Sequence, residues 1–308
     1  MVCLQSAPTS SLPGFQRDLQ TLVQRHLSES GALLIRGFEV PSSREFREFT
    51  SWFGLPLLSY DYGSTPRQDL GEGLYTSTEY PAHQRIPLHN EQAYTRQWPA
   101  ILWFYCETPP QEDGETPIAD SRAVYRQLDP EVRETFERKG LMYVRNYSDG
   151  LDVAWRDVFR TDERAEVEAF CHAQGIECEW GADDALRTRQ TCQVSARHPK
   201  TGVRVWFNQA HLFHVSALAP QLRQLLVSTV GEAHLPRNVY HADGTPIDEA
   251  HLDHIRAVYE ANSLRFPWRQ GDILMLDNML YAHGRNSYKG DRRIVVAMAG
   301  ALDEHELR

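Results

Sequence analysis

The spacing of apolar residues in the first fifth of the chain changes from a helical period to a continuous run and back. Leucine and valine recur at helical spacing over residues 19–27, and Gly31 ends this helix before the apolar run at residues 32–40. Aromatic residues then return to helical spacing over residues 43–53, after a serine that can cap the helix and before Gly54. The chain is therefore expected to open with a helix, a strand and a second helix.

Short apolar runs separated by turn residues predict most of the strands. The run AILWFYC at residues 100–106 has the length and composition of a buried strand, as do residues 272–278 and 292–300 near the end of the chain. Residues 141–148 alternate, which places Tyr143, Arg145 and Tyr147 together on one face of a further strand.

Helical periodicity interrupts these strands in the second half of the chain. Residues 129–140 form a capped helix closed by glycine, and further helices fall within about residues 150–190 and 215–263. Neither internal repeats nor a linker divides the chain. We expect one domain over residues 1–308, mainly β with flanking helices (α+β), in which the latter two segments are helical insertions in a double-layer β roll of the jelly-roll, cupin-like type.

Composition narrows the classes of partner. A formal net charge of -10 disfavours nucleic acid and anionic membrane surfaces, since both attract basic proteins. The N-terminus lacks a basic segment followed by an apolar one, and no long apolar run occurs, so a cytoplasmic location is expected. The five cysteines form an odd set without a CxxC pair, which predicts free thiols.

A metal site is the remaining candidate for the chemistry of this protein, because several common catalytic motifs are absent. The chain has no GxSxG elbow, no phosphate-binding P-loop and no HExxH zinc helix. His89 and Glu91 are two positions apart, so on a strand both would point to one face, although this spacing alone also arises by chance. His283, at the end of a late β-like run, is the candidate third ligand. Two histidines and one carboxylate suit an Fe(II) site that keeps positions open for a keto acid and O2.

Five motifs, in their order along the chain, carry a resemblance to a known family. They are YTSTEYP, IPLHNEQAY, GETPIADSRAVY, HPKTGVRVWFNQAHLFH and LDNMLYAHGRNSYKGDRR. The sequence resembles the taurine dioxygenase superfamily of Fe(II)/2-oxoglutarate-dependent oxygenases. Within it, the chain is most similar to the syringomycin-biosynthesis type and to clavaminate-synthase-like hydroxylases, from GALLIRGF to RRIVVAM.

The resemblance implies a set of ligand-binding residues. His89, Glu91 and His283 would bind Fe(II), while Arg293 and Thr116 would hold the distal carboxylate of the cosubstrate 2-oxoglutarate. A planar guanidinium can bind a carboxylate through two hydrogen bonds, which supports an arginine in this role. Neighbouring residues on a strand face opposite ways, so only one of Arg292 and Arg293 can enter the pocket, and we expect Arg293.

Two differences from related enzymes limit the substrate and the type of reaction that we expect. Taurine dioxygenase has a second arginine four residues beyond the cosubstrate arginine, and counting from Arg293 this chain has Ala297 there, so taurine is a poor candidate substrate. Related halogenases replace the metal-binding carboxylate with a small residue. This chain keeps Glu91, which favours hydroxylation.

The residues that could contact the substrate are indicated by less specific patterns than the metal ligands are. Asn208 and His211 follow a core-like Trp-Phe pair in a polar turn, and they either face the substrate or are structural. Arg145 lies either on a pocket wall or on a solvated strand face. A loop with Arg197, Lys200 and Arg204 either offers a basic docking patch for an acidic carrier protein or is merely solvated.

The expected function is hydroxylation of an unactivated carbon of an amino acid, free or bound to an acyl or peptidyl carrier protein, in nonribosomal-peptide or other secondary-metabolite biosynthesis. Desaturation or cyclisation of a free small acid is the alternative with the same cofactors: Fe(II), 2-oxoglutarate and O2. A metal-binding cupin-like protein without turnover and a zinc hydrolase are alternatives from other classes.

Overall fold

The structure is a computed structural model that describes residues 1–60, 62–63, 65, 67–147 and 153–303. Its first elements follow the predicted order. Helix α1 (Gln16–Ser30) buries leucine and valine on one face and ends at Gly31, whose φ of 77° is a left-handed conformation that glycine adopts without strain. Strand β2 (Ala32–Glu39) and helix α2 (Ser43–Ser51), capped by the Ser42 side chain, come next. Strand β1 (Val2–Ser11) pairs parallel with β2 and was not predicted.

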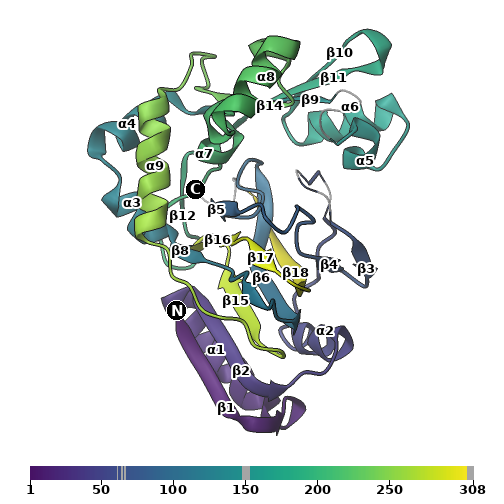
Figure 1. Ribbon diagram of the computed structural model, residues 1–308, viewed down its shortest axis with the longest axis vertical. Helices are drawn as coiled ribbons and strands as arrows, with labels where there is room; N and C mark the ends of the chain where they lie inside the picture. Colours follow the sequence, from purple (N-terminus) through teal and green to yellow (C-terminus); the bar gives the residue numbers. More distant parts are fainter. Residues whose placement is uncertain (61, 64, 66, 148–152, 304–308) are drawn as a thin grey trace.

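A seven-stranded sheet forms the lower half of the molecule (Figure 1). Its order is β1-β2-β15-β6-β18-β4-β3, so late strands lie between early ones. The remaining members are β3 (Asp69–Gly71), β4 (Leu74–Thr76), β6 (Gln97–Thr108), β15 (Ile273–Asp277) and β18 (Arg293–Asp303). Helices α1 and α2 cover one face, where the ring of Phe46 stacks on that of Tyr105 at 5.2 Å between centroids.

A three-stranded sheet packs on the opposite face of the large sheet and completes the jelly-roll core. It consists of β5 (Ile86–His89), β16 (Tyr281–Arg285) and β8 (Ile118–Asp120), in the order β5-β16-β8. Between the two sheets lies an apolar cluster to which β6 gives Phe104, β18 gives Val296 and β8 gives Ile118. Two short pairs extend this part: β7 (Glu112–Asp113) with β17 (Tyr288–Lys289), and β12 (Ser195–Arg197) with β13 (Arg204–Trp206). The predicted fold class is confirmed.

The described residues of 141–192 and 209–263 form a separate layer above the core, which we call the cap (Figure 1). A second sheet, in the order β10-β11-β9-β14, contains β9 (Leu141–Tyr147), β10 (Glu177–Trp180), β11 (Leu186–Cys192) and β14 (Arg237–Tyr240). The helices of the cap are α5 (Trp155–Phe159), α6 (Arg164–Ala173), α7 (Ala210–Phe213), α8 (Pro220–Val230) and α9 (Glu249–Ala261). The two segments predicted as helical insertions thus also carry strands.

Helices α3 (Ser121–Gln127) and α4 (Pro130–Lys139) lead from the core into the cap. The side chains of Asp120 and Asp129 cap their N-termini. All five cysteines are free thiols, as predicted. Within the part of the chain that the structure describes, no helix has the length and apolar character needed to span a membrane.

Candidate active site

His89, Glu91 and His283 converge at the edge of the small sheet, although they are far apart in sequence. Strands β5 and β16 pair so that His283 lies opposite His89, with 4.5 Å between ring centroids. One ligand atom from each of the three side chains lies within 4.8 Å of the others. Strand β5 ends at His89, and a turn rather than a continued strand brings Glu91 to the same side, so the predicted strand geometry is corrected here.

Asn278 fixes the backbone of the turn that carries Glu91. Its Oδ1 accepts a hydrogen bond from the Glu91 amide at 2.7 Å, and its Nδ2 donates to the Glu91 carbonyl at 3.0 Å and to the Pro99 carbonyl at 2.8 Å. Asn278 is fully buried, so these bonds replace those that water would make. The position of Glu91 therefore depends on the connection between β15 and β16.

Burial keeps both histidines of the site neutral. It lowers the pKa of His89 and lowers that of His283 well below its usual range. The Nδ1 atom of His89 lies 2.8 Å from the Pro87 carbonyl, so Nδ1–H donates there and Nε2 keeps a free electron pair. Two neutral imidazoles and a carboxylate at this spacing match the donor set that Fe(II) takes in oxygenases.

Arg67 holds the carboxylate of Glu91 from the other side. Its Nη2 atom lies 2.6 Å from Glu91 Oε2, and its side chain is only 4 % exposed. The guanidinium also lies over the Tyr60 ring, at 4.4 Å from the centroid. Arg67 therefore limits the orientations that Glu91 can adopt.

A narrow hollow of about 30 Å³ beside His283 contains Arg292 and Thr116. The Nη2 atom of Arg292 donates to Thr116 Oγ1 at 3.3 Å, and its Nε donates to the Gly114 carbonyl at 2.9 Å. Burial lowers the pKa of Arg292 to about 10, so the guanidinium remains charged at neutral pH. A charged, partly desolvated guanidinium beside a hydroxyl is suited to binding a carboxylate.

The prediction that Arg293 enters the pocket is wrong. Its side chain is 54 % exposed and pairs with Glu107 at 2.5 Å, on the opposite face of β18 from Arg292. The residues of β18 that share the pocket face with Arg292 are Ile294 and Val296. Counted from Arg292, the position four residues on is therefore Val296 and not Ala297. Neither Val296 nor Ala297 is charged, so the chain lacks the second arginine of taurine dioxygenase at either position.

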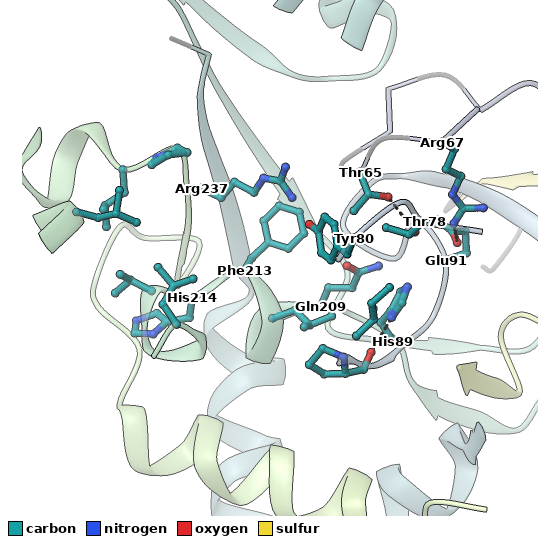
Figure 2. Close-up of a pocket in the computed structure, with 18 residues that line it drawn as sticks. Thr65, Arg67, Thr78, Tyr80, His89, Glu91, Gln209, Phe213, His214 and Arg237 are labelled. Carbon is teal, nitrogen blue, oxygen red and sulfur yellow. Dashed lines mark hydrogen bonds and ion pairs between the residues drawn. The ribbon is translucent and has the colours of Figure 1, made fainter. Parts of the chain in front are cut away.

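A larger cavity of about 320 Å³ opens on the other side of His89 and Glu91, between the small sheet and the cap. Figure 2 shows His89, Glu91 and Arg67 on one side of this cavity and Phe213, His214 and Arg237 on the other. Much of its wall is apolar. The apolar lining residues are Ile86, Pro87, Leu212, Phe213, Val215, Leu218, Leu226, Leu235 and Pro236. Its size lies at the lower end of the range for small-molecule sites, about 300–1,000 Å³.

Comparison with known proteins assigns the family. Residues 5–299 match the model of the taurine catabolism dioxygenase TauD, TfdA family, which is nearly the whole chain. The chain belongs to the TauD, TfdA family. The predicted resemblance is confirmed. This membership makes the protein a dioxygenase that depends on Fe(II), 2-oxoglutarate and O2. A non-catalytic cupin-like protein and a zinc hydrolase are excluded.

Two relatives in the TauD, TfdA family have informative similarity over most of the chain. The dapdiamide synthesis protein DdaC of Enterobacter agglomerans is 40% identical over 272 residues, which cover 88% of this chain and 83% of that protein. A clavaminate synthase-like protein of Arabidopsis thaliana is 30% identical, over 94% of this chain and 89% of its own.

Solved structures share the fold of this TauD, TfdA family member at low sequence identity. PvcB, described as an Fe, alpha-ketoglutarate dependent oxygenase from an isonitrile synthetic pathway, aligns with a TM-score of 0.55 and 15% identity, over 98% of this chain and 88% of its own. AAD-2, solved in complex with Mn(II) and N-oxalylglycine, aligns with a TM-score of 0.52 and 14% identity, over 98% and 95%.

Three predicted substrate contacts of this dioxygenase lie outside the cavity lining. Asn208 is fully buried and bonds to the Val194 carbonyl at 2.7 Å through its Nδ2. The Nε2 atom of His211 lies 2.8 Å from the Leu88 carbonyl. Arg145 is buried, with its guanidinium 4.8 Å from the centroid of the Tyr147 ring. These side chains bond to backbone or pack on aromatic rings, which corrects the expectation that they face the substrate.

The predicted basic patch does not lie at the cavity either. None of Arg197, Lys200 and Arg204 is among the described residues that line it. Arg204 pairs with Glu137 at 3.3 Å, and Lys200 lies beside α1. These three cations therefore do not contact the cavity in which a substrate would bind.

Sequence reasoning missed several residues that line the cavity. Arg67 and Arg237 belong to no recognisable sequence motif, so nothing in the sequence marks them. Gln209 follows Asn208 directly, and its Nε2 donates to the Asn90 carbonyl at 2.7 Å. The only signal was the conspicuous motif around residues 204–214, which pointed to the correct segment but not to the correct side chains.

Proposed function

We propose that this dioxygenase hydroxylates an unactivated carbon of an amino acid or aminoacyl group in the biosynthesis of a small natural product, as one domain spanning residues 1–308. The observation that carries the proposal is the convergence of one carboxylate and two neutral imidazoles where the small-molecule cavity, lined by His89 and Glu91, adjoins the narrow hollow lined by His283. Similarity to a protein of dapdiamide synthesis supports the biosynthetic context.

In this proposal His89, Glu91 and His283 hold Fe(II). When bound, the metal supplies the redox chemistry that couples oxidation of the substrate by O2 to decarboxylation of 2-oxoglutarate. The balance is one substrate C–H, one O2 and one 2-oxoglutarate converted to one C–OH, one succinate and one CO2. The chain keeps the carboxylate of Glu91, which related halogenases replace with a small residue, and this supports hydroxylation over halogenation. Arg67 keeps the Glu91 carboxylate oriented through its 2.6 Å contact.

Arg292 and Thr116 are proposed to bind the distal carboxylate of 2-oxoglutarate. Both lie in the narrow hollow that His283 also lines. The Thr116 hydroxyl accepts from Trp268 Nε1 at 3.2 Å, so its own proton is available to a carboxylate oxygen. In this proposal the cosubstrate lies on one side of the proposed metal ligands and the substrate cavity on the other.

Delivery of the substrate has two candidate modes. A free amino acid derivative is the first candidate, because a cavity of about 320 Å³ lies within the range of small-molecule sites. An aminoacyl group on a carrier protein is the second candidate, because the cavity shares His214, Val215 and Leu218 with an outer hollow of about 520 Å³ that a flexible arm could pass through.

Turnover assays test the proposal. Protein supplied aerobically with Fe(II) and 2-oxoglutarate should release succinate, and mass spectrometry with candidate amino acids, free and carrier-bound, should show a product that gains one oxygen atom. A product that instead loses two hydrogen atoms would replace hydroxylation with desaturation. If no succinate forms with any candidate, the proposed activity is wrong. Faster conversion of the tethered form would select the carrier-bound substrate.

A further inference from the structure

One side-chain amide on the wall of the substrate cavity presents an acceptor that no described residue uses. It belongs to Gln209, which is only 4 % exposed and lies between Phe213 and His89 in the view of Figure 2. No described residue donates a hydrogen bond to its Oε1, and Oε1 is not one of the polar atoms that the protein encloses completely. Oε1 therefore opens to the cavity that Gln209 lines.

Hydrogen bonds from the backbone and the side chain fix the direction of this amide. The Gln209 backbone N–H donates to the Tyr143 hydroxyl at 2.8 Å, and its Nε2 donates to the Asn90 carbonyl at 2.7 Å. A carbonyl only accepts, so Nε2 and Oε1 cannot exchange places. Asn90 lies between the proposed metal ligands His89 and Glu91 in the sequence. Oε1 of Gln209 is therefore a preoriented acceptor beside the proposed metal site.

A substrate that fills the cavity has to satisfy this acceptor. Binding displaces water from Oε1, and a covered acceptor that finds no donor is unfavourable. The next lining residues along the chain, Leu212 and Phe213 of α7, have apolar side chains that offer no donor. The substrate must therefore bring an N–H or an O–H to Gln209.

The acidic groups of the cavity limit the charge of that donor. Glu91 is the one acidic residue among the described lining residues, and it pairs with Arg67 at 2.6 Å and is a proposed metal ligand. A substrate ammonium group would therefore be buried without a carboxylate available to it, which is unfavourable. The nitrogen of an amino acid derivative is a cation when it is free and an uncharged N–H when it is acylated. The acylated form meets both requirements of the wall.

We propose that Oε1 of Gln209 accepts a hydrogen bond from the amide N–H of a substrate whose amine is acylated. Gln209 thereby selects an N-acyl amino acid derivative over the free amine and holds the acylated nitrogen beside the proposed metal site. The rest of the substrate lies on the apolar side chains of α7, α8 and the segment before β14. This inference rests on the proposed function, and it makes Gln209 a residue that determines specificity.

Ligands that differ in one group test this hydrogen bond directly. For each of several apolar side chains, three methyl esters are compared: the N-acetyl amino acid ester, which has the amide N–H; the O-acetyl 2-hydroxy acid ester, in which oxygen replaces that N–H; and the free amino acid ester, which is a cation below its pKa. Binding to the enzyme loaded with Fe(II) and 2-oxoglutarate is measured anaerobically by calorimetry. For side chains that bind, the Kd of the N-acetyl form should be about tenfold lower than that of either other form.

Variants assign the preference to Gln209. Gln209→Met removes the acceptor, as does Gln209→Leu should the first variant fail to fold, so the N-acetyl and O-acetyl forms should bind within about twofold of each other. Loss of the bond to Asn90 would weaken both forms alike and leave their ratio unchanged. Gln193→Met is the matched control, because Gln193 Nε2 donates to the Ala93 carbonyl at 2.9 Å in the same turn but Gln193 does not line the cavity. It should keep the wild-type ratio, and thermal unfolding checks that each variant is folded.

Several results would overturn the inference. They are equal binding of the N-acetyl and O-acetyl forms to the wild type, tightest binding of the cationic form to the wild type, survival of the N-acetyl preference in a folded Gln209 variant, and failure of every N-acetyl form to bind at up to about 10 mM, a weak-binding limit. Succinate release by the wild type separates this inference from the proposed function. If succinate forms but the N-acetyl form is not preferred, only the role of Gln209 fails. If no succinate forms, the proposed function fails whatever the ligands do.

Discussion

The jelly-roll core and the cap contribute to the same cavity in different ways. In the core, all five residues of β15 are buried, and apolar clusters lie on both faces of the large sheet. In the cap, α8 has no buried residue and exposes Leu222 and Leu225. The core is therefore tightly packed around the proposed metal and cosubstrate residues. Much of the cap shares a buried apolar cluster of its own, and it is α8, beside the substrate cavity, that packs loosely.

Because of this difference, the core carries the residues proposed for the reaction chemistry, and the cap carries much of the wall that contacts the substrate. The groups proposed to hold Fe(II) and 2-oxoglutarate are fixed by buried hydrogen bonds such as those of Asn278 and Arg292. The far wall consists largely of apolar side chains, together with Arg237, and is carried by elements of the cap. In this chain, changes in the cap can therefore alter substrate selection without disturbing the core.

Removing a proposed metal ligand should have the largest effect. Replacement of His283 or Glu91 with alanine removes one of three ligands and should lower Fe(II) affinity and turnover by more than about 100-fold, beyond the usual effect of losing an outer-shell partner. Metal content and succinate release measure this. His172→Ala, an exposed position on α6, is the control. Near-normal iron binding in His283→Ala would contradict the proposed triad.

The cosubstrate arginine should give the next largest effect. Arg292→Lys replaces a bidentate group with a point charge, so the KM for 2-oxoglutarate should rise about 30-fold, equivalent to about 2 kcal/mol. Arg293→Lys should change the KM little, because Arg293 is exposed and pairs with Glu107. If Arg293→Lys raised the KM more than Arg292→Lys, Arg293 would be the residue that binds 2-oxoglutarate, as first expected from the sequence.

The contact between core and cap should be sensitive to acid through His211. This histidine of α7 bonds to the Leu88 carbonyl of β5, and burial lowers its pKa to about 3. The unfolded chain takes up the proton near the ordinary pKa of about 6.5, so protons favour unfolding and stability falls as the pH drops from 6.5 toward 3.

His211→Gln should remove this contribution. Urea unfolding should show that the wild type loses about 2 kcal/mol more than the variant between pH 6.5 and pH 5. His83→Gln, at an exposed loop position, should follow the wild type. Equal pH dependence in His211→Gln and the wild type would show that His211 is not the acid-sensitive link.

Substitutions on the outer face of α8 should have the smallest effect. Leu225 is 61% exposed, so Leu225→Gln should change the free energy of unfolding by less than about 0.5 kcal/mol. Leu226→Gln, one residue on, changes the cavity wall and should raise the substrate KM severalfold without altering the KM for 2-oxoglutarate. A large loss of stability in Leu225→Gln would mean that α8 is packed as tightly as the core.

The sequence predicted the elements better than it predicted the direction of side chains. Helix α1 and strand β15 were identified because their apolar patterns and the glycine after α1 are unambiguous. The faces of β18 could not be distinguished, since residues on both of its sides are apolar and buried, and alternation is then invisible. This is why Arg293 was chosen over Arg292.

The sequence also predicted poorly which side chains line the cavity. His89, Glu91 and His283 were found because ligand types and spacing restrict metal sites. The position of Arg237 at the cavity gave no such signal, because it depends on the pairing of β14 with β9, which joins segments about ninety residues apart in a sheet that was not predicted.

The strand order of the large sheet has a consequence for synthesis on the ribosome. Strand β15 lies between β2 and β6, and β18 lies between β6 and β4, so the last strands to emerge are the ones that join the earlier ones. Until they emerge, the nascent chain carries apolar strands with open edges, a state that invites aggregation and chaperone binding. His283 also emerges after these early strands, so the proposed iron site can be completed only once this late segment has left the ribosome.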